Sequence, residues 1–286
     1  MARRSFFRRA RGDSPAKRIA IHAVLILASI ISIYPFLRVI SISLRPSNQL
    51  LSTSLAIIPP GASLENYRAL IFERDFTIWV WNSLIVSAAS VLVGLMLAAT
   101  AAYAFSRWQF PGRRQGLLFL LTTQMIPAGM LLLPICIMVV RLKLFNTYTG
   151  MAIAYSVGSV PFSIWILKGY YDTIPRELEE AALVDGASPL GAFWRVVIPL
   201  STPALAIAGL FSFMTAWNDY MMARVMLQKP DMFTWPVGFQ KLMDQFQTAW
   251  GQFAAASVLV AIPALALFLY SSKWLVSGMT LGGVKG

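Results

Sequence analysis

Six apolar runs of about 20 residues each constrain the fold of this chain more than any other feature. They cover residues 19–37, 84–105, 116–140, 150–167, 201–222 and 253–276. A helix of about 20 apolar residues is long enough to cross the hydrocarbon core of a bilayer. The composition agrees, because 57% of the residues are hydrophobic and only 13% are charged, whereas about a quarter of a soluble domain is charged. We predict an all-α integral membrane protein with six transmembrane helices.

The basic residues predict how these helices are oriented. Residues 1–18 hold seven Lys and Arg residues and a single acid, Asp13. With six spans, the segments on the same side as this tail hold fifteen Lys and Arg residues, and the opposite segments hold eight. Cytoplasmic segments carry such an excess, so we expect both termini in the cytoplasm. The net charge of +12 then reflects topology and contact with anionic lipid headgroups, and not binding to nucleic acid.

The first apolar run is expected to remain as a transmembrane helix. A signal peptide has a shorter apolar core that ends at small residues, but Tyr34 and Phe36 stand where cleavage would occur. The predicted organisation is a basic cytoplasmic tail (1–18), a first transmembrane helix (19–40), a periplasmic loop (41–77), a core of five further helices (78–276) and a cytoplasmic tail (277–286). Within the core lie a cytoplasmic loop (168–200) and an outer loop (223–252).

The cytoplasmic loop 168–200 is unusual because it is acidic. It holds three basic residues and five acids, namely Asp172, Glu177, Glu179, Glu180 and Asp185. Cytoplasmic loops normally lean basic. The loop is either a solvated amphipathic segment or a docking surface for another protein, and its local helix pattern favours docking.

Two helix signatures meet at Gly186 in this loop. Pro175 fits the first turn of one helix, and Gly186 fits the left-handed position that ends it. Ser188 and Pro189 are typical of the N-cap and first residue of a second helix, which Pro199 would end or kink. The apolar residues that this second helix would place on one face are Leu190, Phe193 and Val197.

The patterns of catalytic and ion-coupled proteins are missing from the sequence. It has no Gly-rich phosphate-binding loop, no metal-ligand cluster and no Ser/His/Asp set. No acid lies in the middle of a predicted span, where proton- or sodium-driven carriers keep ionisable residues; Asp219, near the outer end of the fifth, comes closest. A pore for a polar, uncharged solute, powered by another protein, fits best. A self-contained channel or facilitator and a membrane enzyme acting on lipid-linked sugars are the alternatives.

The spaced pattern of the acidic loop resembles the "EAA" loop of binding-protein-dependent ABC importer permeases. Glu180-Ala181-Ala182 is followed after three residues by Gly186, and Val196-Val197-Ile198-Pro199 then matches the family's Ile-x-Leu-Pro. We call residues 172–199 the Glu-Ala-Ala loop. Segments that resemble the carbohydrate importers, and most closely the smaller permease of the maltose/maltodextrin type, include Asn82-Ser83-Leu84, Tyr103-Ala104-Phe105-Ser106-Arg107 and Trp217-Asn218-Asp219.

The resemblance implies a type-I ABC importer transmembrane domain in a bacterial or archaeal cytoplasmic (inner) membrane. It implies as partners a homologous second permease, an ATP-binding cassette ATPase dimer, an extracytoplasmic sugar-binding protein and lipid. ATP and Mg²⁺ would bind to the ATPase, and this chain would be a non-catalytic subunit that binds no cofactor or metal. The cargo would be maltose, maltodextrin or a related α-glucoside such as trehalose or sucrose. Another carbohydrate, such as glycerol-3-phosphate, is the alternative.

The resemblance also implies roles for particular residues. The Glu-Ala-Ala loop would form coupling helices that dock into the ATPase, through Glu179, Glu180, Ala181, Ala182, Asp185, Gly186, Ala187 and Pro199. The C-terminal tail would touch the ATPase dimer through Gly282, Gly283, Val284 and Lys285. Trp217, Asn218 and Asp219, at the outer end of the fifth span, either line the substrate path or cap and pack the helix end. The sequence favours capping and packing for these three.

Overall fold

The computed structural model describes residues 15–46, 56–243 and 248–282, and in these ranges every regular element is a helix. Four helices are long and apolar enough to cross a membrane, and two bent pairs raise the number of candidate spans to six. The four are α1 (Pro15–Ser43), α3 (Phe76–Arg107), α6 (Tyr148–Tyr171) and α13 (Trp250–Gly282). The bent pairs are α4 (Arg113–Thr123) with α5 (Ala128–Arg141), and Pro189–Leu200 with α10 (Thr202–Asn218). The predicted all-α fold class is confirmed.

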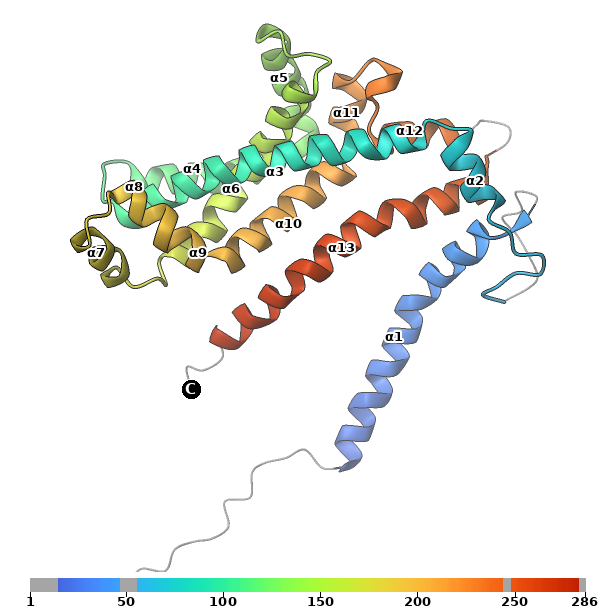
Figure 1. Ribbon diagram of the computed structural model, residues 1–286, viewed down its shortest axis with the longest axis horizontal. Coiled ribbons are helices and arrows are strands. Elements are labelled where there is room, and N and C mark those ends of the chain that lie inside the picture. Colours follow the sequence, from blue (N-terminus) through green and yellow to red (C-terminus); the bar gives the residue numbers. More distant parts are fainter. Residues whose placement is uncertain (1–14, 47–55, 244–247, 283–286) are drawn as a thin grey trace, which may run out of the picture.

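The helix α6 is the central element of the bundle, and α3 and α10 pack against it (Figure 1). Of the apolar stretch of α6, 61% is buried, against 33% for α3 and 22% for α13. Small residues let α3 and α6 approach closely: a Cβ on Gly94 would lie 3.3 Å from Ser159 Oγ. Ser156 Oγ also donates to Ser90 O across this contact, at 3.2 Å. Small side chains and hydroxyl hydrogen bonds are the usual basis of helix packing inside membranes.

The predicted third span, 116–140, is a bent pair of helices in the structure and not one continuous helix. Its two halves, α4 and α5, meet at an angle of 107°. The cause is Pro127, which has no N–H to donate to the helix and disfavours the helical conformation at the residue before it. Pro127 itself is extended, with φ −55° and ψ 132°, and α5 begins directly after it.

The predicted fifth span, 201–222, ends earlier than expected. The helix α10 stops at Asn218, and a short helix, α11 (Met221–Met226), starts after two further residues. Asp219 separates the two, since its backbone is extended and its Oδ1 accepts the backbone N–H of Met222 at 3.0 Å. A side-chain carboxylate at this position satisfies a helix N–H that has no partner within the helix.

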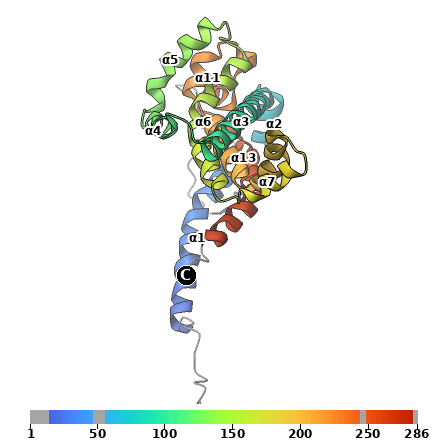
Figure 2. The same cartoon turned by 90° about the vertical axis from the view of Figure 1, so that its left-hand side faces the viewer.

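The first helix, α1, stands apart from the bundle along most of its length (Figures 1 and 2). It contacts α13, close to the end of the bundle opposite the Glu-Ala-Ala loop (Figure 1). Its apolar side chains are open to the surroundings; Ile19 and Phe36, for example, are each 71% exposed. A helix that is apolar all round requires lipid or another apolar protein surface about it.

Buried polar groups at the start of α3 hold the segment between α11 and α13. Asn82 Nδ2 donates to the carbonyls of Asp231 and Phe233, at 2.8 and 3.0 Å. The backbone N–H of Trp235 donates to Ser83 Oγ at 2.7 Å. The remaining short helices at this end of the bundle are α2 (Glu65–Phe72), η3 (Pro230–Met232), α12 (Trp235–Phe239) and η4 (Gln240–Leu242). This end is therefore tied to α3 by side chains that lie one after the other in the sequence.

Candidate functional site

The Glu-Ala-Ala loop folds as two short helical arms joined at a sharp corner, at one end of the bundle (Figure 1). Its elements are α7 (Glu177–Val184), α8 (Pro189–Ala192), the π-helical turn η2 (Phe193–Val197) and α9 (Ile198–Leu200). Gly186 has φ +88°, and the N–H groups of Gly186 and Ala187 donate to the carbonyls of Leu183 and Ala182 at 3.0 and 2.9 Å. These bonds form a Schellman motif. The predicted glycine cap is confirmed.

The second arm starts as predicted but turns differently. Ser188 Oγ accepts the backbone N–H of Gly191 at 3.1 Å, and Pro189 is the first residue of α8. The predicted shared face of Leu190, Phe193 and Val197 is wrong, because Leu190 is 64% exposed while Phe193 and Val197 are buried. The helix widens into a π turn after four residues, so the spacing of 3.6 residues per turn is not kept.

The first arm begins slightly later than predicted. The helix α7 starts at Glu177, two residues after Pro175, so Pro175 precedes the helix and does not lie in its first turn. Three acids stand in that first turn, namely Glu177, Glu179 and Glu180. Negative side chains are favourable there because the N-terminus of a helix carries a partial positive charge.

The corner presents a mixed acidic and apolar surface. Val184 is 88% exposed, and Leu178 and Leu183 are 45% and 42% exposed. Exposed apolar side chains that gather beside charges are typical of a contact surface. Of the predicted coupling residues, the exposed ones are Glu180, Ala181, Asp185, Gly186 and Pro199, and the half-buried ones are Ala182 and Ala187. These seven residues are placed where another protein can reach them.

Glu179, in contrast, faces the interior of the bundle and is not a surface docking residue. Its Oε1 pairs with Arg107 Nε at 2.6 Å, and its Oε2 accepts the hydroxyl of Tyr103 at 2.7 Å. The two charged side chains are only 8% and 9% exposed. Tyr103 and Arg107 lie in a segment that carries the family resemblance, but no local pattern in the sequence indicates their partner, because the pairing joins positions more than 70 residues apart.

A second polar cluster fixes the start of the loop. Asp172 accepts Ser106 Oγ of α3 at 2.6 Å and pairs with Lys168 Nζ of α6. Burial by itself raises the pKa of the Asp172 carboxyl, but hydrogen bonds from Lys168 and Ser106 and the charges of Lys168 and Arg113 outweigh it, so the pKa is lowered. Asp172 therefore stays ionised at neutral pH, as its two partners require.

The three residues at the outer end of α10 have packing and capping roles in the structure. Trp217 is 1% exposed, and its indole N–H donates to Val260 O at 3.2 Å. Asn218 is exposed, and its amide donates back to Met214 O of its own helix at 2.8 Å. Asp219 caps α11, as described above. These contacts favour the interpretation that the sequence also favours.

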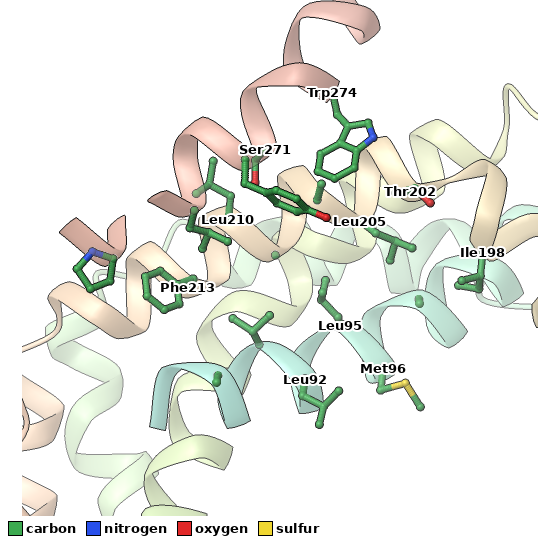
Figure 3. Close-up of a pocket in the computed structure, with 18 of the residues that line it drawn as sticks. Leu92, Leu95, Met96, Ile198, Thr202, Leu205, Leu210, Phe213, Ser271 and Trp274 are labelled. Carbon is green, nitrogen blue, oxygen red and sulfur yellow. The ribbon is translucent and has the colours of Figure 1, made fainter. Parts of the chain in front are cut away.

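An open cavity of about 820 Å³ lies between α3, α10 and α13 (Figure 3). Leu92, Leu95 and Met96 line it from α3, and Leu205 and Leu210 line it from α10. The hydroxyls of its described lining belong to a few residues, Thr202, Tyr270 and Ser271. A sugar would leave most of its hydroxyl groups unpaired on such a surface, which is costly. The lining suits lipid chains or apolar side chains.

The predicted contacts of the C-terminal tail fall mainly outside the described residues. Gly283, Val284 and Lys285 lie there, and Gly282 is the last residue of α13.

Known proteins resemble this chain both in sequence and in fold. The maltose/maltodextrin transport system permease protein MalG of Salmonella typhimurium is 37% identical over 284 residues, which cover 93% of this chain and 95% of that protein. The maltodextrin transport system permease protein MdxG of Bacillus subtilis is 33% identical over 94% of this chain and 96% of its own length.

The fold itself occurs in solved structures. A bacterial ABC transporter involved in the import of the acidic polysaccharide alginate superimposes with a TM-score of 0.79 at 24% identity, over 92% of this chain and 99% of that one. The type-I transporter domain expected from the sequence is therefore confirmed as the fold. Residues 81–280, which include the Glu-Ala-Ala loop, match the family described as "Binding-protein-dependent transport system inner membrane component". This chain belongs to that family.

Proposed function

We propose that this chain is a permease subunit of an ATP-driven importer for maltose, maltodextrin or a related α-glucoside. Relatives named for maltose and maltodextrin match it over more than nine-tenths of its length. The strongest support from the structure is the exposed corner at Gly186, a mixed acidic and apolar contact surface at one end of a bundle of apolar helices. A subunit with such a surface can be driven by a partner that hydrolyses ATP.

In this proposal the corner docks into a cytoplasmic ATPase dimer. The Schellman motif fixes the angle between the two arms, so a push on the loop moves both arms together. The arms continue directly from α6 and into α10, and these two helices would receive the motion. ATP binding would close the ATPase dimer and open the pore to the outside, and hydrolysis would reset it. This chain would form no covalent bonds with its cargo.

The remaining partners would complete the pore and deliver the cargo. A homologous second permease would cover part of the apolar surface that α1 exposes, and lipid would cover the rest. A sugar-binding protein would meet the opposite end of the bundle, where α2, α11 and α12 lie. Both termini would then be cytoplasmic, in accord with the excess of basic residues in the tail 1–18.

The decisive experiment is reconstitution of the complete complex in liposomes. This chain should co-purify with an ATPase and a second permease, and maltose-loaded binding protein should raise ATP hydrolysis several-fold over unloaded binding protein. Loaded proteins for trehalose and for sucrose serve as comparisons of cargo. If no ATPase co-purifies, or if no loaded binding protein stimulates hydrolysis, the proposed function is wrong. If only a binding protein loaded with another sugar stimulates ATP hydrolysis, the proposed cargo is wrong and the proposed importer function stands.

Replacement of Asn218 tests whether the outer end of α10 touches the sugar. We expect Asn218→Ala to keep the uptake rate and its dependence on sugar concentration, because the Asn218 amide bonds only to Met214 O in the described structure. Asp219→Ala is the matched comparison, and it should lower stability by about 1 kcal/mol or more, because Asp219 Oδ1 accepts the backbone N–H groups of α11 and the hydroxyl of Tyr155. A marked rise in the half-saturating sugar concentration for Asn218→Ala would instead place this residue in the substrate path.

A further inference from the structure

Two side chains on α3, Tyr103 and Arg107, hold both arms of the Glu-Ala-Ala loop. They are four residues apart in a helix and therefore lie on the same face. The Tyr103 hydroxyl donates to Glu179 in α7, the first arm, at 2.7 Å. The Tyr103 ring lies 4.6 Å, centroid to centroid, from the ring of Phe193 in η2, the second arm.

Arg107 strengthens the hold on the first arm. Its Nε donates to Glu179 Oε1 at 2.6 Å, and its Nη2 donates to Ile174 O, just before α7, at 3.1 Å. Its Nη1 donates to Ser106 Oγ at 3.2 Å, and Ser106 in turn donates to Asp172. A buried ion pair with this many hydrogen bonds keeps a fixed geometry, because breaking it would leave an unpaired charge inside the protein.

The helix α3 is not joined to the loop through the backbone, unlike α6 and α10. Its opposite end, however, carries Asn82 and Ser83, which hold the segment 231–235. With 32 residues, α3 is about 48 Å long at 1.5 Å per residue, enough to span the membrane. The same helix therefore holds a loop at each end of the bundle through buried side chains.

We propose that Tyr103 and Arg107 form a clamp that makes the Glu-Ala-Ala loop and the adjoining end of α3 one rigid unit. A displacement of the loop is then passed through α3 to the opposite end of the bundle, in addition to the motion that α6 and α10 receive. Tyr103 and Arg107 are positioning residues in this scheme, and their role depends on the coupling function proposed above for the loop.

Distance measurements between spin labels test the rigidity of the unit. The labels are placed on cysteines introduced at Glu177, at the start of α7 and away from the docking corner, and at Gln109 beyond α3, both exposed. The native cysteine is first removed by Cys136→Ser, since it is the only one in the chain. In the complete complex, one narrow distance distribution should persist with and without bound ATP. Arg107→Gln should broaden it. A wild-type distance that changes when ATP binds would overturn the clamp.

Transport stoichiometry provides a second and independent readout. In the reconstituted complex, Arg107→Gln and Tyr103→Phe should keep ATP hydrolysis but lower the sugar imported per ATP, by tenfold or more for Arg107→Gln. Tyr103→Phe retains the ring and its contact with Phe193, so it decides the question alone if Arg107→Gln fails to assemble. Arg114→Gln, which removes an exposed arginine of α4, is the matched control and should transport like the wild type.

The two proposals fail in different ways. If Tyr103→Phe, and Arg107→Gln where it assembles, import the wild-type amount of sugar per ATP, the clamp is wrong although the importer function stands. If the wild-type chain binds no ATPase, the importer function itself is wrong. Restoration of import by the exchanged pair, Arg107→Glu with Glu179→Arg, would support the clamp directly, because the exchange restores the ion pair with its two charges reversed.

Discussion

Gly186→Asp is expected to abolish sugar uptake while the protein stays folded in the membrane. Gly186 has φ +88°, and apart from its two chain neighbours no described residue lies within 4 Å of a Cβ built on it. The substitution therefore causes no clash, but it strains the backbone by about 1–2 kcal/mol and adds a charge at the proposed docking corner. Relief of the strain opens the corner and misaligns the two arms. Sugar uptake by intact cells, together with the amount of protein in the membrane, measures the effect.

Gly112→Asp is a matched control for this substitution. Gly112 also has a positive φ, +86°, and also has nothing within 4 Å of an added Cβ. It lies at the N-terminal end of α4, outside the Glu-Ala-Ala loop, so the substitution adds the same strain and charge away from the proposed docking corner. Uptake should remain close to that of the wild type. Normal uptake by Gly186→Asp, or an equal loss in both variants, would contradict the special role of the corner.

Local signals explain why the shape of this corner could be predicted from the sequence. A glycine cap and a Ser-Pro helix start act within four or five residues, so Gly186, Ser188 and Pro189 determine the corner without help from distant parts of the chain. The position of Leu190 could not be predicted in the same way. It depends on the π turn η2, which begins where Phe193 packs against Tyr103 of α3.

Hydropathy predicted which segments are apolar, but not where they bend. Averaged over a window, residues 116–140 form one apolar run, and the average hides Pro127. The bend of 107° lies at residues 124–127, where Pro127 lacks an N–H and restricts the residue before it. Individual prolines therefore need to be examined inside any predicted span. Pro134, Pro161 and Pro263, by contrast, lie within helices that continue through them.

The opposite placement of Glu179 and Glu180 could not be read from the sequence. Adjacent residues of a helix point about 100° apart, so one of the two faces inward once the helix docks. Which one does so depends on Arg107 and Tyr103, which lie more than 70 residues away. The sequence shows that the loop is acidic. Only the folded structure shows that Glu179 anchors the loop and that Glu180 is exposed.

Because Glu179 is buried and Glu180 is exposed, we expect charge reversals at these two neighbours to affect the stability of the subunit differently. Glu180→Lys changes an exposed side chain, so the subunit should keep its stability to within about 1 kcal/mol but lose sugar uptake and ATPase binding. Glu179→Lys places a positive charge beside Arg107 in a buried site. Loss of one partner of a buried pair costs about 3–5 kcal/mol, so this variant should lose the folded subunit itself. Thermal unfolding of the purified subunit and uptake by cells measure the two effects separately.

Gln109→Lys is the control for an added positive charge. Gln109 is exposed between α3 and α4, outside the Glu-Ala-Ala loop and away from the end of the bundle where the sugar-binding protein is proposed to bind. This variant should fold and transport like the wild type. If Glu180→Lys lowers the unfolding temperature as much as Glu179→Lys, Glu180 is structural and does not dock. Normal uptake by a stable Glu180→Lys would also exclude it from the docking surface. If Glu180→Lys alone of the three variants loses uptake with an intact fold, the contact with the ATPase lies on the exposed side of α7.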